Sequence, residues 1–159
     1  MGVTEFETAL SHYQSVGLDA MAFIYHFEIH PLYSPLTTFL FQHIQDGSLS
    51  ALISVLVPGE VLTGPKKTGD RRLVLLYRHI FAAFPHLQVH DVDMATVELM
   101  SDLRAQYGLR TPDAIHLATT ILHGGQAFIT NDAQLRSEID MDEKLDILVL
   151  RDFITSSSP

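Results

Sequence analysis

The sequence predicts a single α/β domain in which helices cover both faces of a mostly parallel sheet. Short segments typical of strands alternate along the chain with segments typical of helices, and this pattern produces a parallel sheet. The segment LSALISV is rich in Val, Ile and Leu, as expected of a strand that is buried on both faces. The chain has 159 residues, 47% of them hydrophobic, which is enough for one well-buried core.

The first half of the chain begins with an extension at residues 1–14, which we expect to be helical from residue 4. The next segments are expected to be a strand at 15–19, helices at 21–28 and 34–46, a strand at 49–55 and a helical turn at 57–65. Gly64 and Pro65 are expected to end that turn, because glycine and proline commonly end helices. Residues 69–83 place apolar side chains at spacings of three and four, so one face of a helix is apolar.

The second half continues the alternation. The segment LQVHDV predicts a strand at 87–92, and apolar residues at helical spacing predict a helix at 93–107. Gly108 stands where a residue in the left-handed conformation is wanted to end that helix. The last strands are expected at 126–132 and 145–150.

A helix start is expected at RTPDAIHLAT. Thr111 stands at the capping position, Pro112 at the first helical position and Asp113 in the first turn. We expect one domain over residues 15–153, followed by a flexible tail at 154–159.

The composition excludes several classes of protein. There is no cysteine, so a disulfide framework, a thiolate metal site and a cysteine nucleophile are excluded. Glu5 and Glu7 stand near the N-terminus and no Lys or Arg precedes Lys66, which is unlike a secretory or mitochondrial leader. No apolar run approaches the ~20 residues of a membrane-spanning helix. We therefore expect a cytoplasmic protein that does not cross a membrane.

Basic residues gather in one stretch of an acidic chain. The formal net charge is -9, which argues against a protein that coats nucleic acid nonspecifically. Five of the ten basic residues are Lys66, Lys67, Arg71, Arg72 and Arg78. The first four of them are candidates to position a nucleic-acid backbone, because phosphate contacts draw on Lys and Arg. The alternative is that this turn and helix are simply solvated.

Carboxylates are expected to gather at one edge of the sheet. Asp19 and Asp132 each lie at the end of an expected strand, and Asp113 lies at a helix start. Glu60 follows the second strand by a few residues and can reach the same edge, where open α/β sheets usually bind ligands. Divalent cations such as Mg²⁺ prefer oxygen ligands, and a cation offsets the repulsion among crowded carboxylates. Taken singly, each of these acids can also be an ordinary cap or turn residue.

Histidines offer a rival arrangement. His26 and His30 are four residues apart around Glu28, but the HExxH pattern of a zinc protease is absent. His116 stands one helical turn after Asp113, so it either faces the acids or is buried with a satisfied partner.

Four segments carry a resemblance to a known family. GLDAMAFIYHF, ISVLVPGEVLTGP, TPDAIHLATTIL and FITND occur in the order and approximate spacing of PIN-domain proteins, and the last two most resemble bacterial and archaeal members of the toxin type. The resemblance covers about residues 15–153. It implies a three-layer α/β/α sandwich and a Mg²⁺- or Mn²⁺-dependent endoribonuclease. For a toxin-type member it implies a small antitoxin as partner, and we also expect a homodimer.

The same resemblance assigns roles to individual residues. The family's acidic quartet is matched by Asp19, Glu60, Asp113 and Asp132. Of these, Asp19, Asp113 and Asp132 would bind metal. Asn131 and His116 would be accessory residues, and Lys66, Lys67, Arg71 and Arg72 would position RNA.

Two alternatives stay open. Ala20 stands where the family usually has Thr or Ser, whose hydroxyl helps to hold metal or water. This departure and the acidic net charge favour a catalytically weak PIN domain that acts as an RNA- or protein-binding module. A phosphatase-like or receiver-like protein would use one Asp as phosphoryl acceptor, but nothing like a phosphatase nucleophile motif follows Asp19.

Overall fold

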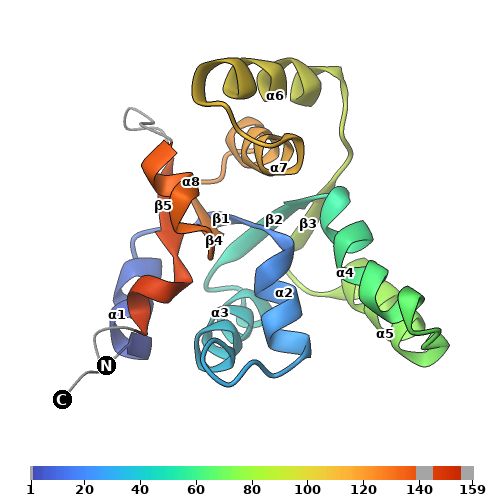
Figure 1. The fold of residues 1–159 in the computed structure, drawn as a ribbon. Helices are drawn as coiled ribbons and strands as arrows, with labels where there is room; N and C mark the ends of the chain where they lie inside the picture. The colour runs from blue at the N-terminus through green and yellow to red at the C-terminus, as the bar shows by residue number, and fades with distance from the viewer. Residues whose placement is uncertain (1, 139–144, 155–159) are drawn as a thin grey trace.

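The strands of the computed structural model, which describes residues 2–138 and 145–154, form one parallel sheet (Figure 1). In chain order they are β1 Ser15–Leu18, β2 Ser50–Ser54, β3 Leu87–His90, β4 Ala127–Thr130 and β5 Asp146–Val149. Their order in the sheet is β3-β2-β1-β4-β5, and every neighbouring pair is parallel. Each strand falls within an expected strand, so the predicted α/β class is confirmed.

Helices connect the strands and cover the sheet. They are α1 Gly2–Leu10, α2 Ala20–Phe27, α3 Ser34–Asp46, α4 Leu56–Lys67, α5 Arg71–Ala83, α6 Met94–Tyr107, α7 Thr111–Leu122, α8 Ala133–Glu138 and the 3₁₀ helix η1 Leu150–Phe153. The sequence did not predict α8 and η1, because so few residues show no clear apolar periodicity. No helix in the described ranges is both long and apolar enough to cross a membrane.

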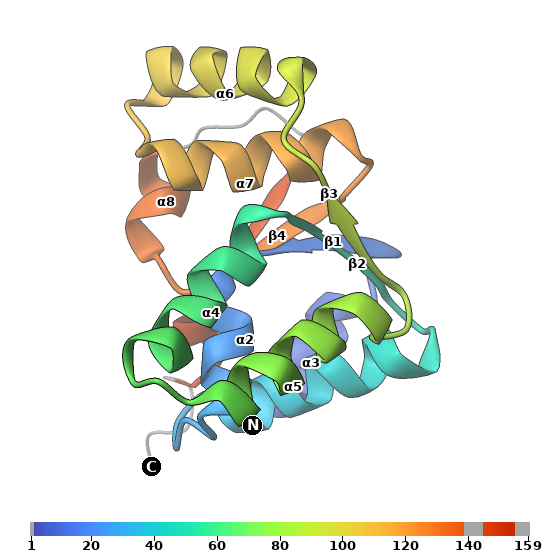
Figure 2. The same cartoon turned by 90° about the vertical axis from the view of Figure 1, so that its right-hand side faces the viewer.

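The sheet separates two apolar cores, as the alternation along β4 shows. Ala127 and Ile129 are buried in one core with residues of α1 to α5, whereas Phe128 is buried in the other with residues of α6, α7 and α8. Successive side chains of a strand point to opposite faces, so a strand covered on both faces is apolar throughout. Figures 1 and 2 show α6 and α7 on one side of the sheet and α2 and α3 on the other. The three-layer α/β/α sandwich is confirmed.

Helix α1 packs into the first of these cores. Phe6 is fully buried, and its ring centroid lies 5.0 Å from that of Phe153 in η1. The division into an extension at 1–14, a domain at 15–153 and a tail stays a proposal. Of the expected tail at 154–159, all but Ile154 lies outside the described residues.

Helix α4 is longer than the sequence suggests. It continues through Gly64 and Pro65 to Lys67, so the expected end of the turn at these two residues was wrong. Pro65 is buried, and its carbonyl accepts hydrogen bonds from the Asp70 amide at 2.9 Å and from Thr68 Oγ1 at 3.2 Å. The burial of Pro65 and these two hydrogen bonds offset the loss of the backbone hydrogen bond that proline cannot donate.

Helix α7 begins one residue earlier than its capping signal predicts. Thr111 is the first helical residue and Arg110 precedes it in an extended conformation without a side-chain cap, so the expected cap at Thr111 was wrong. Pro112 takes the second position, where its missing N–H leaves no donor unpaired. The Ala114 amide donates to the Arg110 carbonyl at 3.0 Å, which closes the first turn without a side-chain cap. As expected, Gly108 ends α6 with a φ of 68°.

Helix α7 approaches strand β1 closely at Gly17. A Cβ on Gly17 would lie 1.9 Å from Thr120 Oγ1 and 2.8 Å from Thr120 Cβ. Thr120 is buried, and its hydroxyl donates to the His116 carbonyl at 2.9 Å. Glycine therefore lets α7, which carries Asp113, lie this close to the strand that leads to Asp19.

We expect Gly17→Ala to destabilise the fold by about 1–3 kcal/mol, because the added methyl group overpacks the contact with Thr120. Gly59→Ala is the matched control: a Cβ there meets nothing within 4 Å, and alanine favours helix α4 by about 0.5–1 kcal/mol. Urea unfolding followed by circular dichroism measures both changes. Equal stability of wild type and Gly17→Ala would contradict the close packing.

Candidate active site

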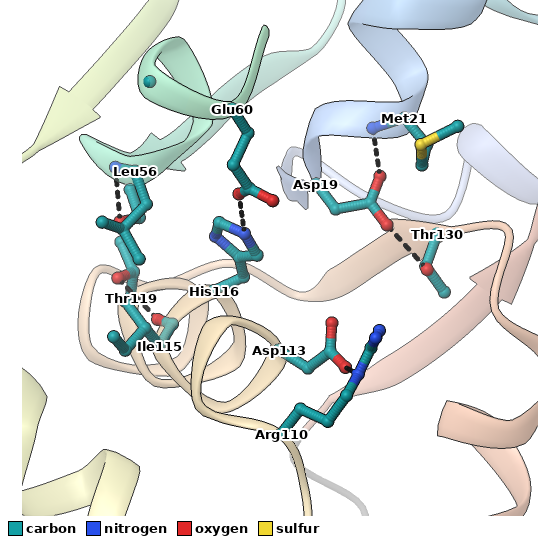
Figure 3. Close-up of polar contacts among 12 residues, drawn as sticks. Asp19, Met21, Leu56, Glu60, Arg110, Asp113, Ile115, His116, Thr119 and Thr130 are labelled. Atoms are coloured by element: carbon teal, nitrogen blue, oxygen red, sulfur yellow. Dashed lines mark hydrogen bonds and ion pairs between the residues drawn. The ribbon is translucent and has the colours of Figure 1, made fainter. Parts of the chain in front are cut away.

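Asp19 is fixed where strand β1 passes into helix α2. Its backbone is extended and its Oδ1 accepts from the Met21 amide at 3.0 Å, so Asp19 is the N-cap of α2. Thr130, the last residue of β4, donates its hydroxyl to Asp19 Oδ2 at 2.7 Å (Figure 3). Strands β1 and β4 are parallel neighbours, so the place where they end brings these two side chains together.

Burial makes the ionised form of Asp19 costly. Loss of solvation raises the pKa of Asp19 from 3.8 to about 6, although the Thr130 hydroxyl, His116 and the amides of Met21 and Ala22 act in the opposite direction. At neutral pH the carboxylate is therefore mostly ionised while it lacks much of its solvation. A cation beside it would offset this cost.

Asp113 lies in the first turn of α7 and faces the same space as Asp19 (Figure 3). Its Oδ2 accepts from Arg110 Nε at 3.1 Å, and the Arg110 side chain is 79% exposed. An ion pair this exposed adds little stability. Arg110 can therefore exchange Asp113 for another anion at little cost.

Glu60 of α4 is paired with His116 of α7. Glu60 Oε1 lies 2.7 Å from His116 Nε2 (Figure 3). His116 is 3% exposed, and its Nδ1 is buried without a hydrogen-bond partner in the part of the chain that the structure describes. Nε2 is the ring nitrogen that reaches Glu60, so it donates its N–H to that carboxylate. His116 is thus buried, and its partner is one of the acids.

Asp132 and Asn131 follow strand β4. Asp132 Oδ1 accepts from the Gln134 amide at 3.0 Å at the start of α8. Asn131 is fixed at both ends of its side chain, because Nδ2 donates to the Tyr25 hydroxyl at 3.0 Å and Oδ1 accepts from the Arg151 amide at 2.9 Å. Asn131 therefore joins α2, β4 and η1, while Oδ2 of Asp132 accepts no hydrogen bond from another described residue.

These side chains line one open pocket of about 520 Å³, the acidic pocket, near the carboxyl ends of β1 and β4. Its polar lining residues are Tyr25, Asp19, Glu60, Arg110, Asp113, His116, Thr130, Asn131 and Asp132. The structure therefore brings the four acids expected from the sequence to one place. Among the described residues, no three acidic or histidine side chains are close enough to hold a metal ion jointly.

The sequence matches the family model described as the PIN domain over residues 16–137. The chain belongs to the PIN-domain family. The resemblance seen in the sequence is thereby confirmed, and PIN domains are generally nucleases. No protein with a curated description matches the chain significantly.

Solved structures share the fold of this PIN domain at low sequence identity. A toxin-antitoxin complex from Klebsiella pneumoniae has a TM-score of 0.58 at 21% identity, covering 83% of this chain and 95% of that one. VapBC2 from Rickettsia felis, bound to a DNA fragment from its promoter, has a TM-score of 0.64 at 16% identity, covering 84% and 97%. DNA-bound VapBC from Salmonella typhimurium has a TM-score of 0.61 at 18% identity, covering 86% and 98%.

The acidic pocket of this PIN domain offers ligands that suit a divalent metal ion. PIN nucleases generally use divalent metals, and both Mg²⁺ and Mn²⁺ prefer carboxylate oxygen and water. The second oxygens of Glu60, Asp113 and Asp132 (Oε2, Oδ1 and Oδ2) accept no hydrogen bond from another described residue. Since Mg²⁺ keeps several of its waters, carboxylates can also bind it through water.

The basic residues of the PIN domain divide into two groups. Lys66, Arg71 and Arg78 line a separate pocket of about 400 Å³ where α4 meets α5, here called the basic pocket. Lys67 and Arg72 are exposed but do not line it. None of the five lines the acidic pocket.

Three polar residues of the acidic pocket were missed in the sequence. Thr130 directly precedes Asn131 at a strand end, and Arg110 stands three residues before Asp113, so both positions carried a local signal. Tyr25 carried none, because only packing brings its hydroxyl to Asn131.

We expect Asp19→Asn to raise the melting temperature in EDTA by a few degrees at about pH 8. The pKa of Asp19 is about 6 in the folded state and 3.8 in the unfolded state. Between these pH values the folded state binds more protons than the unfolded state, so the free energy of unfolding falls as the pH rises from about 4 to above 6. Asn carries no such charge, so the advantage should disappear near pH 4. Melting curves across this pH range measure the effect.

Asp93→Asn is the control, because the pKa of Asp93 is lowered where that of Asp19 is raised. Hydrogen bonds from Thr96 lower the pKa of Asp93, so its carboxylate stabilises the fold above the unfolded pKa and loses this effect only in acid. This variant should not be more stable than wild type at any pH. A gain for Asp93→Asn equal to that of Asp19→Asn would contradict the assigned burial cost.

Proposed function

We propose that the protein is a divalent-metal-dependent endoribonuclease that hydrolyses RNA phosphodiester bonds. One observation carries the proposal: Asp19, Glu60, Asp113 and Asp132 reach one open pocket from four separate segments of a PIN domain. Burial alone raises the pKa of Asp19 to about 6, so its charged form is costly in this pocket without a cation beside it. A cation-binding role explains why a pocket would retain the four acids.

Asp19, Asp113 and Asp132 would hold Mg²⁺ or Mn²⁺ in this proposal. The bound ion would lower the pKa of a water molecule and neutralise charge on the phosphoryl oxygens. The Met21 amide and Thr130 hydroxyl hold the Asp19 carboxylate in one orientation before any ligand arrives. Preorganisation of this kind avoids a reorganisation cost during the reaction.

The other pocket residues have supporting roles. His116 fixes one oxygen of Glu60 and leaves the second oxygen for a water or an ion. Arg110 can leave Asp113 for a phosphate oxygen, because its present ion pair is exposed and weak. The basic residues at the junction of α4 and α5 add favourable charge for RNA beyond the acidic pocket.

We further propose that the protein is the toxin of a toxin-antitoxin pair. Three structures of similar fold are described as toxin-antitoxin or VapBC complexes. A small antitoxin would be the partner, and a neighbouring reading frame that encodes one would support this role. A homodimer is also proposed, because Ile29 and Leu32, which lie close together in the turn between α2 and α3, are 75% and 58% exposed.

A catalytically weak binding module is the second candidate. Ala20 lacks the hydroxyl that the family usually has after the first Asp, which favours this role. However, the Thr130 hydroxyl reaches Asp19 from strand β4, so a hydroxyl is present beside that carboxylate. Cleavage assays separate the two candidates.

We expect Asp19→Asn and Asp113→Asn each to fold and each to lose at least about 100-fold of the metal-dependent RNA cleavage. Asn keeps the size and much of the capping capacity of Asp but removes its charge. The double variant should be little worse than either single one, because residues that act on one ion are strongly non-additive. A pool of structured and single-stranded RNA, with and without EDTA, is the substrate, and Asp93→Asn is the control outside the pocket.

Cleavage that persists in EDTA and in both single variants would exclude the metal-dependent nuclease. No cleavage of any RNA by the wild type would favour the binding module. Losses that multiply in the double variant would show that the two carboxylates act separately.

We also expect millimolar Mg²⁺ or Mn²⁺ to raise the melting temperature of the wild type by a few degrees, because an ion that binds only the folded state stabilises it by mass action. Asp113→Asn should lose most of this gain, and Asp93→Asn should keep it. Differential scanning fluorimetry at constant ionic strength measures the shift. A melting temperature that metal leaves unchanged in all three proteins would count against the site.

A further inference from the structure

Three pockets follow one another along helices α2, α4 and α5. Between the acidic and basic pockets lies a third pocket of about 400 Å³, here called the aromatic pocket, whose lining includes Phe27, Tyr77, Val61 and Leu73. Ile24 and Glu60 line both the acidic and the aromatic pocket. Pro65 lines both the aromatic and the basic pocket. The three pockets therefore form a continuous surface.

The aromatic pocket suits a nucleobase better than a phosphate. The rings of Phe27 and Tyr77 stack with centroids 4.4 Å apart and an interplanar angle of 20°, and aliphatic side chains surround them. Glu28 and Glu60 also line the pocket, so a phosphate would be repelled there. Tyr77 is buried behind Phe27, so an unpaired base can lie against the partly exposed ring of Phe27 and offer its amino groups to the carboxylates, which a base paired in duplex RNA cannot do.

The basic pocket has the opposite character. Lys66, Arg71 and Arg78 line it, and none of them forms an ion pair with another described residue. The pocket also includes the first residues of the 13-residue helix α5, whose N-terminal end favours an anion. Asp70 is the only acid among the lining residues, and its Oδ1 already accepts from the Leu73 amide at 3.1 Å. This chemistry suits a phosphate.

Helix α4 carries residues of all three pockets in a fixed order. Glu60 and Lys66 lie on the same helix, six residues and so about 9 Å apart along its axis. A single strand whose scissile phosphate lies in the acidic pocket can therefore place the adjoining base in the aromatic pocket. A nearby phosphate of the same strand then meets the basic pocket.

We propose that single-stranded RNA runs from the acidic pocket along α4, with one unpaired base in the aromatic pocket and a phosphate in the basic pocket bound by Lys66, Arg71 and Arg78. The proposal rests on the proposed ribonuclease function and adds the path of the substrate. It also separates Lys66 and Arg71, which bind the strand, from Lys67 and Arg72, which do not.

Two double variants test the basic pocket with equal loss of charge. Lys66→Gln/Arg71→Gln removes two pocket residues, and Lys67→Gln/Arg72→Gln removes two adjacent exposed charges. Binding of a fluorescein-labelled single-stranded RNA is followed by anisotropy in Mg²⁺, with Asp113→Asn in every protein to prevent cleavage. We expect Lys66→Gln/Arg71→Gln to weaken binding at least about tenfold. It should also reduce the slope of the logarithm of the binding constant against the logarithm of the salt concentration by about 1.4, because each lost contact to a single strand contributes ~0.7. The control pair should weaken binding less than about threefold.

An abasic scan of the RNA tests the aromatic pocket without altering the protein. Removing one base, close to the position that wild-type protein cleaves, should weaken binding about tenfold, because a single stacked base contributes this much. Removal of bases far from that position should have little effect. Duplex RNA of the same sequence should bind more weakly than the single strand, whereas attraction by charge alone would favour the duplex.

Equal weakening by the two double variants, or an abasic scan without a sensitive position, would overturn the path. If wild type still cleaved RNA in that case, the ribonuclease function would stand and the pockets would serve another partner, such as a protein segment. If wild type neither bound nor cleaved any RNA, both proposals would fail. A clear difference between the pairs without cleavage would support the path in a protein that only binds RNA.

Discussion

The close contact between Gly17 and Thr120 sets how near helix α7 lies to strand β1, and the acidic pocket depends on it. Strand β1 leads to Asp19, and the first turn of α7 carries Asp113, so this contact fixes the two carboxylates on the same pocket. The parallel pairing of β1 with β4 then adds Thr130 and Asp132. Segments far apart in the sequence meet at one edge because parallel strands all end there.

The pocket carries an electrostatic cost that the rest of the fold must offset. Asp19 is desolvated enough for its pKa to rise to about 6, and three more acids share the pocket with it. Neutral and cationic donors reduce this cost: Thr130 and Met21 at Asp19, His116 at Glu60 and Arg110 at Asp113. These partners hold the carboxylates in place, and the second oxygens of Glu60, Asp113 and Asp132 accept no hydrogen bond from another described residue, so they can bind water or a cation.

The surface around the pocket divides its charges in space. Acids and their partners lie at the carboxyl ends of β1 and β4, whereas Lys66, Arg71 and Arg78 gather at the junction of α4 and α5. The aromatic pocket lies between the two groups. An overall charge of -9 is therefore compatible with a local attraction for a polyanion, since short-range contacts decide where phosphates can lie.

The sequence by itself determined the α/β class, the order of the strands and of the longer helices, the family and the acids at strand ends and helix starts, because these follow from local periodicity and motifs. Only the tertiary structure decided the extension of α4 through Pro65, the pairing of Glu60 with His116, the Thr130 hydroxyl at Asp19 and the separation of Lys66 and Arg71 from Lys67 and Arg72. Glu60 and His116 are 56 residues apart, and Asp19 and Thr130 are 111 apart. No local pattern fixes such pairs, because their distance depends on how helices pack on the sheet.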